Sequence, residues 1–133
     1  MISAVDTSVL LDVFTADPVF LEPSKVALRR AIREGALIIC DVVLAELRPW
    51  FPTRKMLSEA LTRLGISFVP ITEEAALLAG ETWTQYRAAG GPQEHLIPDF
   101  LIAAHARESA DRLLTRDRGF YRKWFENLPL LEP

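Results

Sequence analysis

Short apolar runs alternate with longer helical patterns along this 133-residue sequence, and no other feature restricts the possible fold as much. The runs expected to form strands are Ile2–Val5, Ala36–Cys40, Phe68–Ile71 and Arg112–Thr115, with a last apolar segment at Leu128–Leu131. The segments between them carry apolar residues at helical spacing. Strands that alternate with helices favour a parallel sheet covered on both faces. We therefore predict a three-layer α/β domain with a central parallel sheet.

Capping residues and helix-stopping residues give the expected helices. In chain order they are Val9–Phe14 after the capping residues Thr7 and Ser8, a helix from Pro23 to Gly35, Val42–Leu47 capped by Asp41, a helix from Thr53 to Gly65, a helix from Thr72 to Gly90, Asp99–Ser109 after Pro98, and Phe120–Phe125.

Length and composition are those of one ordinary folded domain, which we expect to span residues 1–133. Half of the residues are hydrophobic, which suffices for a buried core. The single cysteine, Cys40, excludes an intramolecular disulfide and a cysteine-based zinc site. No apolar run reaches the length of a membrane helix. These features fit a cytoplasmic protein without a membrane partner.

Four carboxylates occupy positions where a ligand site is expected. Asp6 and Asp117 directly follow predicted strands, Asp99 opens a predicted helix, and Glu46 lies within one. The carboxyl ends of parallel strands meet at one edge of the sheet, where ligands gather. Each acid alone has an ordinary structural explanation, as a helix cap, a dipole partner, a turn residue or a solvent-facing side chain. Only the combination indicates a site.

The segments that carry these acids resemble a known family. AVDTSVLLDVF, DVVLAEL, PDFLIAAHA and LLTRDRGF are similar, in the same order, to the four acidic motifs of PIN domains. The similarity extends from residue 2 to about residue 120 and is greatest to VapC-type toxin ribonucleases of toxin–antitoxin pairs. It implies that Asp6, Glu46, Asp99 and Asp117 form a metal-binding catalytic cluster, supported by the hydroxyl of Thr115.

The chemistry of such a cluster agrees with this implication. Clustered carboxylates repel one another unless a cation lies between them. Oxygen ligands without cysteine select Mg²⁺, with Mn²⁺ as a possible substitute, and the ion lowers the pKa of its water for attack on a phosphodiester. We expect Asp6 and Asp99 to hold the principal ion. Glu46 and Asp117 would complete a second site or hold metal-bound water.

The charge of the chain leaves an RNA partner open. The net charge of −3 counts against nucleic acid, but the remainder is slightly positive once the four carboxylates are assigned to metal. Arg87, Arg116 and Arg118 are candidate contacts to RNA phosphates. Base stacking by Phe120, Tyr121 or Trp124 and inward packing of these rings are equally compatible with the sequence.

Several other polar and aromatic residues are not assigned to the site. We expect structural or surface roles for His95 and His105, and we place Asp12 outside the site. The sequence leaves open whether Trp50 and Phe51 belong to the core or to an exposed interface.

The resemblance implies a toxin ribonuclease, held inactive by a protein antitoxin and assembled as a homodimer. Two alternatives remain open. One is a PIN nuclease in RNA processing without an antitoxin, and the other is a non-catalytic scaffold that binds RNA or protein. The presence of all four acids counts against the scaffold. The RNA target, the number of metal ions and the identity of an antitoxin are not encoded in any pattern recognised in the sequence.

Overall fold

The computed structural model describes residues 1–92 and 95–133, except for the side chain of Arg118. In the described residues, five parallel strands form one sheet in the order β3-β2-β1-β4-β5. Their bounds are Ile2–Val5 for β1, Ala36–Ile39 for β2, Ile66–Phe68 for β3, Arg112–Leu114 for β4 and Leu130–Leu131 for β5. The predicted α/β fold with a central parallel sheet is confirmed.

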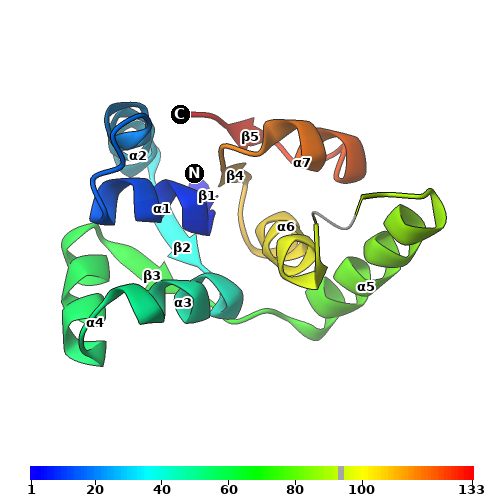
Figure 1. Ribbon diagram of the computed structural model, residues 1–133, viewed down its shortest axis with the longest axis horizontal. Coiled ribbons are helices and arrows are strands. Elements are labelled where there is room, and N and C mark those ends of the chain that lie inside the picture. Colours follow the sequence, from blue (N-terminus) through cyan, green and yellow to red (C-terminus); the bar gives the residue numbers. More distant parts are fainter. Residues whose placement is uncertain (93–94) are drawn as a thin grey trace.

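The helices lie on both sides of this sheet, with α1 to α4 toward the left of Figure 1 and α5, α6 and α7 toward the right. Their bounds are Thr7–Phe14 for α1, Leu21–Glu34 for α2, Asp41–Leu47 for α3, Arg54–Arg63 for α4, Glu73–Ala88 for α5, Ile97–Ser109 for α6 and Arg118–Trp124 for α7, with a 3₁₀ turn at Arg48–Trp50. None of the helices in the described part of the chain is long and apolar enough to cross a membrane.

The core is built around α6 and the two strands beneath it. Phe100, Ala103 and Ala104 of α6 are completely buried, as is Leu113 of β4. α6 contacts α5, β1, β4 and α3. Because β1 and β4 are covered on both faces, they lack the alternating pattern of half-exposed strands. Their polar residues, Ser3 and Arg112, are buried and hydrogen-bonded to each other at 2.8 Å. The buried setting of α6 fixes the position of its first turn, which carries Asp99.

The third strand begins two residues earlier than predicted. Gly65 adopts φ +68° after α4, and the chain then pairs at once with β2, placing Ile66 opposite Leu37. Pro70 has no N–H to continue the ladder, and the N–H of Ile71 instead donates to the Asp41 carboxylate at 2.7 Å. Asp41 is the first residue of α3 rather than its cap. Its side chain holds the loop after β3.

The first helix also begins earlier than predicted. Its cap is Asp6, in an extended conformation, rather than Thr7 or Ser8, and the helix starts at Thr7. α6 likewise starts at Ile97, although Pro98 occupies the first turn as expected. In both cases the helix gains two residues next to a predicted site residue.

Candidate active site

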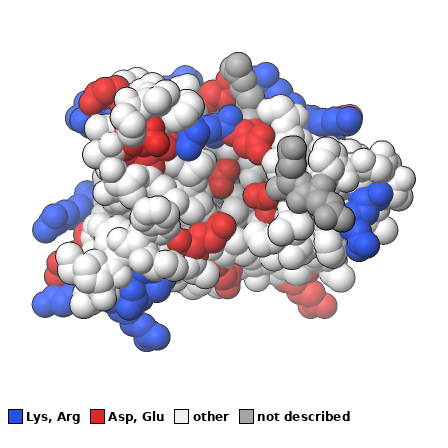
Figure 2. All heavy atoms as spheres, in the orientation of Figure 1, with Lys and Arg blue, Asp and Glu red and all other residues white. Residues whose placement is uncertain are grey.

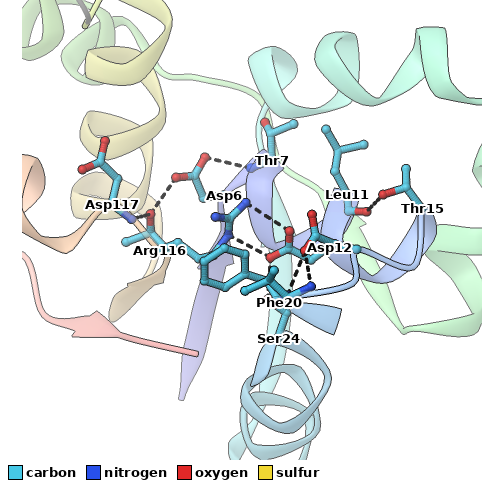
Figure 3. Close-up of polar contacts among 12 residues, drawn as sticks. Asp6, Thr7, Leu11, Asp12, Thr15, Phe20, Ser24, Arg116 and Asp117 are labelled. Atoms are coloured by element: carbon cyan, nitrogen blue, oxygen red, sulfur yellow. Dashed lines mark hydrogen bonds and ion pairs between the residues drawn. The ribbon is translucent and has the colours of Figure 1, made fainter. Parts of the chain in front are cut away.

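Asp6 lies at the carboxyl end of β1, in the middle of the sheet, and is 7% exposed. Its N–H donates to Leu114 O of β4 at 2.9 Å, and the strand register places it beside Thr115. Its Oδ1 accepts the N–H of Thr7 at 2.8 Å, as Figure 3 shows, and its Oδ2 accepts the Thr115 hydroxyl at 2.7 Å. The carboxylate is thus held in one orientation by neighbours on two elements.

The pKa of Asp6 is raised from the ordinary value of 3.8 to about 6. Burial is the largest cause. The hydrogen bonds from Thr115 and Thr7 oppose it, and the negative charges of Asp99 and Glu46 raise the pKa further. Three of the predicted site carboxylates therefore act on one another electrostatically, although they come from different elements.

The fourth carboxylate, that of Asp117, acts electrostatically on the buried phenol of Tyr121. The Tyr121 hydroxyl lies 3.4 Å from Asp6 Oδ2, and its pKa is raised well above its usual value. Burial is the main cause, followed by the charges of Asp6, Asp99 and Asp117. Tyr121 is 1% exposed, so its ring packs inward and is not available for base stacking; Phe120, 8% exposed, packs inward as well.

Thr7 joins Asp6 to Glu46. Its hydroxyl donates to Glu46 Oε1 at 2.8 Å, while its backbone N–H donates to Asp6. Glu46 itself lies on the exposed face of α3. Thr7 was not among the predicted site residues, although its hydroxyl directly after Asp6 was the available signal.

His95 lies between the two remaining carboxylates, not apart from the site as we expected. Its Nδ1 is 3.3 Å from Asp99 Oδ2, and its Nε2 is 3.6 Å from Asp117 Oδ2. The ring stacks on Phe120 with 3.8 Å between centroids. His95 lies before α6, which starts at Ile97, so no helical spacing in the sequence indicated this contact. His105, in contrast, is buried and bonds to the Val69 carbonyl at 2.9 Å, in keeping with the structural role predicted for it.

The chemistry of these side chains suits a hard divalent cation. Carboxylate and hydroxyl oxygens are the donors that Mg²⁺ and Mn²⁺ prefer. A cation would offset both the burial of the Asp6 charge, which is the main cause of its raised pKa, and the smaller repulsion from Asp99 and Glu46. Figure 2 shows Asp and Glu grouped across the middle of this face, with Lys and Arg mostly at its margins. Among the residues that the structure describes, however, no three His, Cys, Asp or Glu side chains already form a metal-binding group.

The three arginines predicted to contact RNA differ in their surroundings. Arg87 is exposed at the end of α5, its guanidinium 5.0 Å from the centre of the Trp83 ring, and it lines a cleft of about 330 Å³ together with His95. Arg116 is paired with an internal carboxylate, that of Asp12. The side chain of Arg118 lies outside the described residues.

The aromatic pair left open by the sequence is divided between surface and core. Trp50 is 59% exposed, whereas Phe51 is half-buried and packs edge-on against Phe14 with 5.3 Å between ring centroids. Trp50 alone is therefore an exposed apolar side chain at this turn.

A family model described as PIN domain matches residues 4–125, which include all four carboxylates. The chain belongs to the PIN-domain family. The similarity to PIN domains seen in the acidic motifs is thus confirmed over nearly the whole sequence. No curated protein matches the sequence.

Solved structures share the fold of this PIN domain at low sequence identity. A chain of VapBC2 from Rickettsia felis, bound to a promoter DNA fragment, is 22% identical, with a TM-score of 0.74 over 99% of this chain and 98% of that one. A toxin–antitoxin complex from Klebsiella pneumoniae gives 18% identity and a TM-score of 0.63, over 97% and 95% of the two chains. VapC20 of Mycobacterium tuberculosis, described as a sarcin–ricin loop cleaving toxin, is 18% identical, with a TM-score of 0.58 over 84% of this chain and 86% of that one.

Proposed function

We propose that this PIN domain is a Mg²⁺-dependent endoribonuclease, with Mn²⁺ as an alternative ion. The observation that carries the proposal is the buried carboxylate of Asp6, with the charges of Asp99 and Glu46 close enough to raise its pKa. A buried acid facing other acids is unfavourable in the metal-free protein. The same negative charges that repel one another in the metal-free protein would attract a divalent cation. This arrangement of acids therefore favours metal binding.

The roles follow from how each side chain is held. We assign Asp6 and Asp99 to the principal ion, and Glu46 and Asp117 to a second ion or to metal-bound water. Thr115 fixes one oxygen of Asp6, and Thr7 fixes one oxygen of Glu46. When bound, such an ion lowers the pKa of water and stabilises negative charge on phosphate oxygens.

We assign the RNA contacts to Arg87 and Arg118. Support for Arg87 comes from its exposure and from the cleft that it shares with His95, which reaches Asp99 and Asp117. An exposed guanidinium beside an aromatic ring can bind a phosphate while the ring stacks on a base. Arg118 directly follows Asp117 in the sequence.

We further propose that the protein is a cytoplasmic toxin with a protein antitoxin, and that it forms a homodimer. The similarity in fold to chains of VapBC2 and of the Klebsiella pneumoniae toxin–antitoxin complex supports a protein partner. The exposed Trp50 offers an apolar contact for such a partner. Residues 1–133 are assigned to one domain, because the last strand, β5, pairs with β4 of the same sheet.

The test is RNA cleavage by purified protein that is free of any partner. We expect cleavage of structured RNA with Mg²⁺ or Mn²⁺, and its loss with EDTA. Asp99→Asn removes a charge worth several kcal/mol to the transition state, so the rate should fall about 100-fold or more. Asp41→Asn is the matched control, since Asp41, like Asp99, is an acid in a first helical turn, although Asp41 is exposed and Asp99 is half-buried. Its amide still accepts the N–H of Ile71, so this variant should cleave normally.

Two results would contradict the proposal. Cleavage that survives EDTA or Asp99→Asn would remove the carboxylate–metal mechanism. No cleavage of total cellular RNA, with RNA still bound, would favour the non-catalytic scaffold instead. The alternative of an RNA-processing nuclease predicts the same cleavage and differs in having no antitoxin that suppresses it.

A further inference from the structure

Asp12 on α1 is a buried carboxylate that the proposed reaction does not use. Its side chain is only 3% exposed, and an acid buried to this degree is stable only with charged or hydrogen-bonding partners. It has two: the Ser24 hydroxyl of α2 donates to Oδ2 at 2.7 Å, and Arg116 approaches from the far end of the chain. The three residues meet where α1, α2 and the segment after β4 come together (Figure 3).

Arg116 is fixed there by three contacts. Its Nε lies 2.8 Å from Asp12 Oδ2, and its Nη2 donates to Asp12 Oδ1 at 3.0 Å. The guanidinium also lies 4.0 Å from the centre of the Phe20 ring, just before α2. The Nη2 hydrogen bond, the close Nε ion-pair contact and the stacking on the ring together hold the guanidinium in place. The arrangement holds the side chain, which is 31% exposed, against α1.

Arg116 stands in the chain directly between two residues of the proposed site, Thr115 and Asp117. The residue before it, Thr115, donates its hydroxyl to Asp6 and accepts the N–H of Asp117 at 3.1 Å. The residue after it, Asp117, is the last one before α7, and its side chain is 51% exposed. The path of the backbone between the buried Thr115 and the exposed Asp117 therefore depends on how Arg116 is anchored.

We propose that Asp12 and Arg116 form a positioning pair that sets the place of Asp117 in the carboxylate cluster. The inference rests on the proposed function, and it removes Arg116 from the RNA contacts expected from the sequence. Arg116 does not touch substrate in this proposal. It acts through the backbone of Asp117 and through Thr115, whose hydroxyl bonds to both Asp6 and Asp117.

The experiment compares Arg116→Gln, Asp12→Asn and the double variant by Mn²⁺ calorimetry and by RNA cleavage kinetics. Loss of a residue that orients a metal ligand commonly costs 10- to 100-fold in metal affinity or activity. We expect each single variant to weaken Mn²⁺ binding and to lower kcat by about tenfold or more, with KM for RNA nearly unchanged. Because the two side chains act as one unit, the double variant should lose little more than either single one.

Arg122→Gln is the matched control, because it removes the same charge from α7, where Arg122 pairs with Glu132 at the surface. It should keep normal Mn²⁺ affinity and normal kcat. Thermal unfolding of every variant guards against simple misfolding. If Asp12→Asn does not fold, Arg116→Lys replaces it, since lysine keeps the charge but cannot make the two-point contact. An intermediate loss in Arg116→Lys is then expected.

The outcomes separate this inference from the proposed function. A higher KM with unchanged Mn²⁺ affinity in Arg116→Gln would make Arg116 a phosphate contact and overturn the positioning role. Unchanged Mn²⁺ affinity and kcat in both single variants would overturn it as well. Wild-type protein that binds no Mn²⁺ would overturn the proposed function and, with it, the inference.

Discussion

At the scale of single residues, Asp6 is a carboxylate that is both buried and close to other negative charges. It ends the central strand, where it is shielded from water, and it shares its surroundings with Asp99 and Glu46. Its pKa of about 6 lies above the ordinary 3.8, so the folded protein holds a proton there that the unfolded chain has already released. The resulting stabilisation is complete below pH 4 and is lost as the pH rises through about 6.

Asp6→Asn should therefore stabilise the metal-free protein at pH 8 and have little effect at pH 4. A difference of about two pKa units corresponds to roughly 3 kcal/mol, an upper bound because hydrogen bonds to Thr7 and Thr115 also change. The measurement is denaturant unfolding in EDTA at both pH values. An equal loss of stability at both would mean that the hydrogen bonds of Asp6 outweigh its charge.

The four acids of the candidate site were singled out in the sequence by their combination and by the resemblance of their segments to PIN-domain motifs, since each acid alone has an ordinary structural explanation. The residues that hold them were harder to predict. Asp12 and Arg116 are 104 residues apart, and only the pairing of β1 with β4 brings them together. Local patterns carry no record of such a contact. Arg116 consequently resembled a free basic residue, and Asp12 resembled an ordinary position on α1.

At the scale of elements, the connections to the sheet decide where the strands begin. The runs that form β1, β2 and β4 were predictable because they are mostly apolar, as is usual for strands covered on both faces. β3 was placed too late, since its start depends on a glycine turn and on pairing with β2 rather than on hydrophobicity. Gly35 makes the corresponding connection between α2 and β2, with φ +156°.

Gly35→Ala should destabilise the protein strongly. A Cβ at this position would lie 1.8 Å from the carbonyl oxygen of Met1, which accepts the N–H of Ala36 at 2.9 Å and starts the pairing of β1 with β2. Backbone on both sides cannot move without breaking that pairing, so we expect a loss of about 1–3 kcal/mol. Unfolding in urea measures it.

Gly80→Ala is the matched control for that substitution. Gly80 lies inside α5, and an added Cβ would meet nothing within 4 Å. Alanine in a helix interior is more stable than glycine by about 0.5–1 kcal/mol, so this variant should gain stability. Equal effects of the two substitutions would show that the contact with Met1 does not constrain the sheet.

At the scale of the whole molecule, the distribution of charge links metal binding to substrate binding. The chain carries a net charge of −3, and a group of its acids lies across the middle of the face in Figure 2. RNA phosphates would be repelled by this region in the metal-free protein. In the proposed function, a divalent cation neutralises the cluster before a phosphodiester approaches it, and the same ion should stabilise the folded chain.

Mn²⁺ should accordingly raise the unfolding temperature of the protein, and EDTA should reverse the effect. An ion at about 100 times its dissociation constant adds about 2.7 kcal/mol, or roughly 5–10 °C for a domain of this size. The increase should be smaller at pH 5 than at pH 8, because protons compete for Asp6, whose pKa is about 6. Asp99→Asn should lose most of the increase, whereas Glu59→Gln, at an exposed acid on α4, should keep it. The same increase in both variants would place the bound ion outside the carboxylate cluster.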